Sequence, residues 1–187
     1  MRIVGGRFKG RTLAAPSGTS VRPTSDRVRE AIFNILAHGV AGFAFEGIKV
    51  LDLFAGTGAL GLEALSRGAA HCLFVEEDAE ARASIRRNVE ALGLTGATRI
   101  FRRDATSLGA ASHHGGAGLA FLDPPYGMAL AERALLSLAQ GNWLAAGAIV
   151  VIEEAKAAPV ALPAGYADLD RRSWGDTQVL FGQWQCF

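Results

Sequence analysis

Three glycines at fixed spacing, Gly56, Gly58 and Gly61, form the clearest chemical signal in this sequence. They follow an apolar stretch typical of a buried strand and open a stretch with helical spacing. Glycines in such a turn let the backbone bend sharply and approach a ligand without Cβ atoms in between. The helix start beyond them would offer free N–H groups. Glu76, 20 residues after Gly56, ends the next predicted strand, where a carboxylate can accept hydrogen bonds from both hydroxyls of a ribose.

This turn predicts a nucleotide-like ligand but does not decide which one. NAD, FAD and S-adenosylmethionine can all bind at a glycine-rich turn that is followed by an acidic residue. Asp52 lies inside the strand that precedes the glycines. A buried carboxylate there needs hydrogen-bond partners, which either a ligand or backbone N–H groups can supply.

A second motif, Asp123-Pro124-Pro125-Tyr126, separates these cofactors. It ends an apolar strand, and ligands of open α/β sheets bind beyond the carboxyl ends of strands, so it should face the same crevice as Gly56. The prolines stiffen the loop and remove two backbone donors, which leaves acceptors. Acceptors can hold the N–H bonds of an exocyclic amine and orient its lone pair toward an electrophile. We predict as catalytic residues Asp123, Pro124 and Tyr126, the last through its ring face rather than its hydroxyl.

Hydrophobic periodicity places both motifs in a series of alternating strands and helices. Buried strands are predicted at 49–54, 71–76, 98–102, 118–122 and 148–153. Helices are predicted between them: the first ends near residue 67, and two others cover 78–92 and 129–140. Repeated βα units predict an α/β, Rossmann-like fold with a mostly parallel sheet, and two β-rich runs within 166–184 predict a closing antiparallel hairpin. Residues 1–40 predict a short basic β-hairpin and then a helix from about 24 to 39.

The 187 residues suit one domain, with residues 48–187 as the core and residues 1–40 packed on it. Two cysteines are too few for a disulfide framework or a Cys-rich zinc site. No apolar run approaches the length of about 20 residues that a membrane span needs, and the first residues lack the apolar region of a signal peptide. We therefore expect a cytoplasmic protein with no membrane partner.

The stretch 105–117 fits no element, and its composition allows either a short helix or an exposed loop. His113 and His114 lie within it, but no Cys or carboxylate stands near them at the spacing of metal ligands. We predict no metal site.

The net charge of +1 conceals an asymmetry. Residues 1–29 carry seven Arg or Lys against one acidic residue, a charge of +6, whereas the remaining residues carry −5. A basic segment on an acidic body indicates an anionic partner, and nucleic acid is the first candidate. A solvated, Arg-rich surface is the alternative.

The chain resembles the S-adenosylmethionine-dependent amino-methyltransferases, and among them the RsmD-type family that methylates N2 of a guanine in 16S ribosomal RNA. Three blocks carry the resemblance: MRIVGGRFKGRTL with RPTSDRVREAIFNIL, LDLFAGTGALGLEALSRGA with FVEED, and FLDPPYG. The closing WGDTQVLFG is also similar. The first block is specific to this family, and the middle blocks are shared by many methyltransferases.

This resemblance implies roles for individual residues of the motifs. The methionine and ribose end of the cofactor would be lined by Phe54, Gly56 and Gly58, the ribose held by Glu76, and the adenine amine bound by Asp104. The segment from Arg22 to Arg29 would close over the cofactor or guide the RNA. The predicted RNA contacts are Lys9, Arg11, Arg22 and Arg27, and the partner would be ribosomal RNA, free or within the small subunit.

Three other functions stay open at this point. The DPPY motif also serves adenine-N6 methylation of DNA or RNA, although this chain offers no separate domain for selecting a DNA sequence. An NAD-dependent oxidoreductase would need a substrate domain and a catalytic base that the sequence does not reveal. An RNA-binding module without activity would have no need of both motifs.

Overall fold

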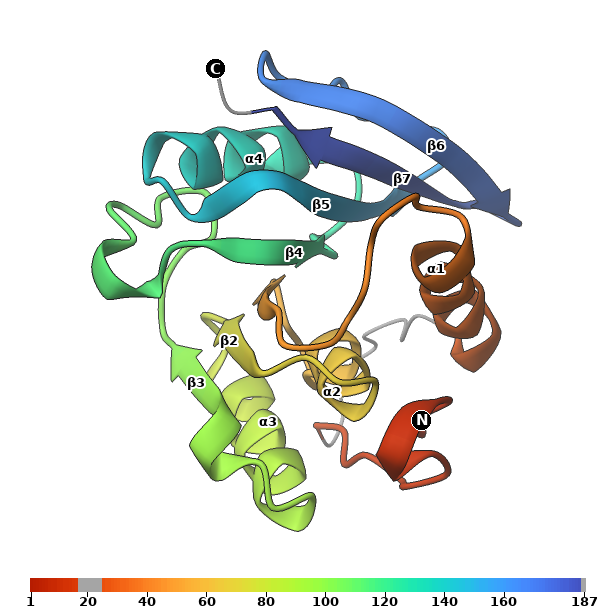
Figure 1. Cartoon of the computed structure of the whole chain (residues 1–187), viewed down its shortest axis with the longest axis vertical. Helices are drawn as coiled ribbons and strands as arrows, with labels where there is room; N and C mark the ends of the chain where they lie inside the picture. Colours follow the sequence, from red (N-terminus) through yellow and green to blue (C-terminus); the bar gives the residue numbers. More distant parts are fainter. Residues whose placement is uncertain (17–24, 186–187) are drawn as a thin grey trace.

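The structure, a computed structural model, describes residues 1–16 and 25–185, and a seven-stranded sheet forms its centre (Figure 1). In chain order the strands are β1 (Lys49–Leu53), β2 (His71–Val75), β3 (Thr98–Phe101), β4 (Ala117–Leu122), β5 (Leu144–Ala155), β6 (Tyr166–Trp174) and β7 (Thr177–Trp184). Their order across the sheet is β3-β2-β1-β4-β5-β7-β6. The first five strands are parallel, and β7 and β6 add an antiparallel pair. This confirms the predicted fold class.

Four helices cover the two faces of the sheet: α1 (Asp26–His38), α2 (Ala59–Ser66), α3 (Ala79–Ala91) and α4 (Leu130–Gln140). Because side chains alternate between the faces of a strand, the sheet contributes to two cores. Val50, Phe74 and Phe121 pack with α1, α2 and α3. Leu51 and Val75 pack with α4 on the other face. None of the described helices is long and apolar enough to cross a membrane.

The stretch 105–117 is largely an irregular, partly exposed loop whose buried apolar residues join the second core. Ala105, Leu108 and Ala111 are buried with α4. The Leu108 N–H donates to the hydroxyl of Ser137 (2.8 Å), and a short 3-10 turn, η3 (Ser112–His114), precedes β4. Within the described residues, no three His, Cys, Asp or Glu side chains gather into a group that could hold a metal ion.

The predicted N-terminal β-hairpin is present as a short antiparallel pairing. Arg2 and Thr12 form its bridge, which is flanked by backbone hydrogen bonds from the Ile3 N–H to the Arg11 carbonyl (2.9 Å) and from the Leu13 N–H to the Met1 carbonyl (3.1 Å), and a 3-10 turn, η1 (Gly6–Phe8), connects the two arms. Two other backbone N–H groups of this segment bond to side chains of α2. Val4 donates to the Glu63 carboxylate (2.8 Å) and Phe8 to the Ser66 hydroxyl (3.0 Å). The short hairpin is therefore fastened to the body of the protein through α2.

Candidate active site

The carboxyl ends of β2, β1 and β4 bring the predicted motifs to one edge of the sheet. In the register of the parallel strands, Leu53 lies opposite Val75 on one side and Leu122 on the other. The residue after each of these positions belongs to a predicted site, and these residues are Phe54, Glu76 and Asp123. The three motifs therefore begin side by side, as the sequence predicted.

The glycine-rich turn is built from residues in the left-handed region of backbone space. Phe54 has φ 57°, Gly56 has φ 56° and Gly58 has φ 79°. A left-handed residue with a side chain costs roughly 1 kcal/mol, so Phe54 marks a strained position at the site. A Cβ at Gly56 would meet no described atom within 4 Å, whereas one at Gly61 would lie 2.5 Å from Cys72 Sγ. Gly56 therefore leaves room for a ligand, and Gly61 lets α2 pack closely on β2.

Glu76 holds this turn and still offers acceptor capacity. Its Oε2 accepts the N–H of Gly56 (2.8 Å), and its Oε1 accepts the N–H of Asp78 (2.9 Å). The side chain is only half-buried. Each carboxylate oxygen has a second lone pair, so the group could accept two further hydrogen bonds from the hydroxyls of a ribose.

Asp104 lies on the same edge, three residues after the end of β3. Its Oδ1 accepts hydrogen bonds from the hydroxyl (2.7 Å) and the N–H (2.8 Å) of Thr106. These hydrogen bonds lower the pKa of Asp104 although slight burial opposes the shift. The carboxylate is exposed, ionised at neutral pH and able to accept an amine N–H.

The loop after β4 holds Asp123 and Tyr126 half-buried, with Pro124 buried between them. The hydroxyl of Tyr126 donates to Glu153 Oε1 (2.8 Å), and the N–H of Gly127 donates to Glu154 Oε1 (3.0 Å). Sequence reasoning missed both glutamates. The signal that could have found them is a pair of adjacent carboxylates at the end of an apolar strand, VIEEA.

Asp52 is buried beneath the turn, and a backbone group is its partner. Its Oδ2 accepts the N–H of Gly61 (2.9 Å). That N–H belongs to the first turn of α2, whose N-cap residue Gly58 has no side chain to accept it. Burial raises the pKa of Asp52 to about 8, the Gly61 hydrogen bond opposes this shift, and the nearby charge of Glu76 adds to it.

Three of the four predicted RNA contacts can be placed. Lys9 and Arg11 are exposed on the N-terminal segment, and Arg27 is exposed on α1. Arg11 also donates to the carbonyl of Ala91 at the end of α3 (2.9 Å). Arg22 lies outside the described residues.

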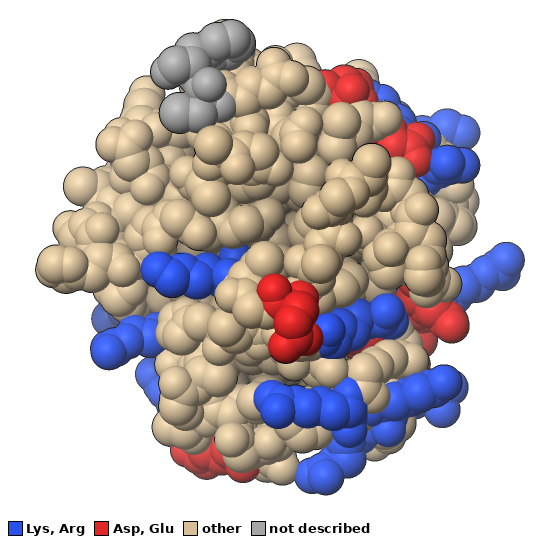
Figure 2. Space-filling view, viewed as in Figure 1, with Lys and Arg blue, Asp and Glu red and all other residues tan. Residues whose placement is uncertain are grey.

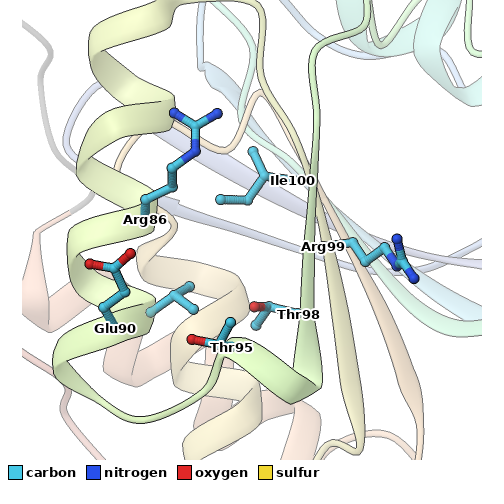
Figure 3. A pocket seen from close by; sticks show the side chains of 7 residues that line it. Arg86, Glu90, Thr95, Thr98, Arg99 and Ile100 are labelled. Carbon is cyan, nitrogen blue, oxygen red and sulfur yellow. The ribbon is translucent and has the colours of Figure 1, made fainter.

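Further arginines extend this basic surface. Figure 2 shows one face of the molecule, viewed as in Figure 1. Many of its Lys and Arg side chains gather over the half that carries the N-terminal segment, α3 and β3. Arg86 on α3 and Arg99 on β3 are exposed, and both line a shallow hollow together with Glu90 and Thr95. In Figure 3 the Arg86 side chain reaches toward Ile100, while Arg99 points away from α3. The acidic overall charge of residues 30–187 had concealed these arginines.

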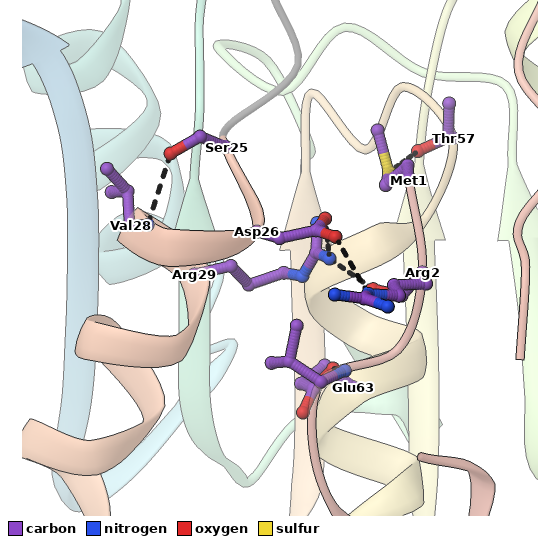
Figure 4. Close-up of polar contacts among 9 residues, drawn as sticks. Met1, Arg2, Ser25, Asp26, Val28, Arg29, Thr57 and Glu63 are labelled. Carbon is purple, nitrogen blue, oxygen red and sulfur yellow. Dashed lines mark hydrogen bonds and ion pairs between the residues drawn. The ribbon is translucent and has the colours of Figure 1, made fainter. Parts of the chain in front are cut away.

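Arg29, one of the seven basic residues of the N-terminal region, is not part of the surface. It is fully buried, and its Nη2 donates to Asp26 Oδ1 (2.8 Å) and to the backbone carbonyl of Arg2 (Figure 4). Figure 4 also shows Thr57 of the glycine-rich turn beside Met1, where the Thr57 hydroxyl donates to the Met1 sulfur (3.4 Å). The N-terminal segment therefore lies directly against the candidate site.

The parallel sheet, the glycine-rich turn beside a strand-end carboxylate, and the DPPY loop at the same edge together define the class of Rossmann-like methyltransferases. Residues 1–183 match the family described as "Conserved hypothetical protein 95", and the chain belongs to this family, the RsmD family.

Named relatives are similar to this chain in sequence over most of its length. The "Ribosomal RNA small subunit methyltransferase D" of Escherichia coli strain K12 is 38% identical over 155 residues, which cover 82% of this chain and 74% of that protein. The protein of the same name from Haemophilus influenzae is 33% identical over 177 residues, covering 94% and 89%. The solved structure of yhhF from Escherichia coli superposes with a TM-score of 0.83 at 31% identity and covers 99% of this chain and 98% of that one.

The raised pKa of Asp52 predicts a pH-dependent stability. A carboxyl group whose folded pKa lies above its unfolded value stabilises the fold fully at acid pH, and this contribution is lost as pH rises from about 4 to about 8. The loss is at most about 1.4 kcal/mol per pH unit. Asp52→Asn does not titrate, so its free energy of unfolding should rise relative to the original protein as pH increases up to about 8.

Denaturant unfolding at several pH values measures this difference. Asp104→Asn is the matched control, because its lowered pKa gives a contribution of opposite sign that is lost only in acid. Parallel stability curves for the original protein and Asp52→Asn would contradict the assignment.

Proposed function

We propose that this protein transfers a methyl group from S-adenosylmethionine to the exocyclic N2 amine of a guanine in small-subunit ribosomal RNA, in the cytoplasm. The observation that carries the proposal is the adjacency of the Gly56–Glu76 cradle and the Asp123 carboxylate at one sheet edge. The relatives named as small-subunit rRNA methyltransferases support the choice of substrate.

The order of the strands supports an extended ligand along this edge. Asp104 follows β3, Glu76 follows β2, the glycine-rich turn follows β1 and Asp123 follows β4. Asp104 would therefore accept the adenine amine, Glu76 the ribose hydroxyls, and the open space at Gly56 would admit the methionine end. When bound, the cofactor would supply an electrophilic methyl group at its sulfonium.

Asp123 is proposed to act on the target amine. The lone pair of guanine N2 is delocalised into the ring, which makes this nitrogen a poor nucleophile. A carboxylate that accepts an N–H hydrogen bond favours the pyramidal nitrogen and stabilises the positive charge that develops on it. Asp123 need not be a strong base, because the proton can leave after the methyl group has been transferred. Pro124 has no N–H, so the loop presents acceptors to the amine.

The test of this function is methyl transfer to small-subunit rRNA, with the modified nucleoside identified by mass spectrometry. We expect N2-methylguanosine, and Asp123→Ala should lower turnover about 100-fold or more while the affinity for S-adenosylmethionine changes less than about twofold. N6-methyladenosine as the product would support the alternative target. Full activity of Asp123→Ala would contradict the role of the carboxylate.

Cofactor binding should depend on Glu76. Glu76→Ala removes charge-assisted hydrogen bonds of about 1.5–3 kcal/mol, so the dissociation constant for S-adenosylmethionine in calorimetry should rise at least about tenfold. Glu77→Ala changes the adjacent exposed carboxylate and should leave the affinity unchanged. Equal affinity of Glu76→Ala and the original protein would remove Glu76 from the proposed site.

RNA binding should depend on the basic surface. Lys9→Glu and Arg11→Glu, made singly, should each weaken RNA binding and flatten its dependence on salt, because each loses a cation that neutralises a phosphate. Arg172→Glu makes the same charge change on β6, at the opposite edge of the sheet from β3, and should have a smaller effect. Unchanged affinity and salt slope for Lys9→Glu and Arg11→Glu would reduce this segment to a solvated surface.

A further inference from the structure

We propose that Glu153 is a positioning residue that holds the ring of Tyr126 in the orientation needed to stack on the target base, with Glu154 fixing the next residue of the loop. This inference rests on the proposed function and deepens it. It also revises the sequence-based expectation that only the ring face of Tyr126 matters.

Strand β5 extends beyond the end of β4. Leu122, the last residue of β4, lies opposite Ile152 of β5. β5 continues to Ala155, so its last three residues run beside the loop that contains Asp123 and Tyr126. The neighbouring strand thus provides a rigid support for a loop that would otherwise extend beyond the sheet.

The hydroxyl of Tyr126 lies against two side chains of the neighbouring strands. It donates to Glu153 Oε1 (2.8 Å) and lies 3.4 Å from Thr177 Oγ1. Glu153 pairs with Val179 and Ala155 with Thr177, so Glu153 and Thr177 occupy diagonal positions on the same face of the sheet. Both are buried, with 6% exposure each. The far end of the tyrosine ring is therefore fixed inside the protein, while the half-buried ring keeps exposed surface for stacking.

A second glutamate contacts the loop from the opposite face of β5. Glu154 is 3% exposed, and its Oε1 accepts the N–H groups of Gly127 (3.0 Å) and Ala155 (2.7 Å). Because successive residues of a strand point to opposite faces, Glu153 and Glu154 hold consecutive residues of the loop from two sides. This leaves the loop little freedom to rotate.

The protonation state suits this role. Burial raises the pKa of the Tyr126 hydroxyl well above its ordinary value, and the Glu153 carboxylate raises it further, although Thr177 opposes the shift. The hydroxyl therefore remains a donor over the whole physiological pH range, and its bond to a carboxylate is charge-assisted.

The kinetic test compares Tyr126→Phe, Glu153→Ala and the double variant in single-turnover methyl transfer to small-subunit rRNA. We expect each single variant to lower the rate about tenfold with S-adenosylmethionine affinity within about twofold. The double variant should be no slower than the slower single one, since both act through one hydrogen bond. Glu153→Gln keeps an acceptor and should recover part of the rate.

Tyr166→Phe, which removes a hydroxyl that donates to the Leu135 carbonyl (2.7 Å) away from the site, should react at the original rate. Additive losses, or an original rate for Tyr126→Phe, would overturn the proposal.

A second measurement does not depend on RNA methylation. The chain has only two tyrosines, so NMR of protein with labelled tyrosine rings resolves Tyr126 with Tyr166 as an internal control. Glu153→Ala should shift the Tyr126 ring signals and increase ring motion while those of Tyr166 stay in place. Unchanged Tyr126 signals would overturn the positioning role. Shifted Tyr126 signals in a protein that methylates no RNA would instead place the failure in the proposed function.

Discussion

Two backbone hydrogen bonds at the carboxyl end of β1 hold the candidate site together. The Ala55 N–H donates to the Val75 carbonyl (3.2 Å) on one side, and the Asp123 N–H donates to the Leu53 carbonyl (3.4 Å) on the other. The chain runs from β1 outward through β2 to β3, then returns to place β4 on the opposite side of β1. Open α/β sheets bind ligands at such a reversal of strand order, and every proposed step of this protein's chemistry depends on it.

Carboxyl groups that accept backbone N–H groups recur at each point where a loop or helix must be held. Asp52 accepts an N–H group from the first turn of α2, and Glu63 accepts one from the N-terminal segment. Glu76 accepts an N–H group from the glycine-rich turn, and Glu154 accepts one from the DPPY loop. Some of the acidic side chains of residues 30–187 are therefore internal, and burial keeps that of Asp52 protonated at neutral pH. The charge of Arg29 is internal as well. The surface that a polyanion meets is consequently set by the exposed arginines and lysines and not by the total charge along the chain.

The sequence was sufficient wherever a local signal determined the structure. Strand β1 was predicted from an apolar run, and the turn after it from glycine spacing, because both depend on neighbouring residues. The N-terminal hairpin was predicted as a local pairing, but its attachment to α2 was not, because Glu63 and Ser66, which accept the N–H groups of Val4 and Phe8, are distant in sequence. The anchoring of Tyr126 by Glu153 was invisible for the same reason, since no local pattern reports which strand lies beside a loop.

In the proposed function, one cofactor would extend along the carboxyl edge of the sheet from β3 to β4 and present its methyl group to Asp123. A crystal structure of the protein with S-adenosylhomocysteine tests it most directly. We expect the ribose hydroxyls on the Glu76 carboxylate, the adenine next to Asp104, and the sulfur facing the Asp123 loop. A ligand bound with its ribose away from Glu76, or with its sulfur directed away from Asp123, would contradict it.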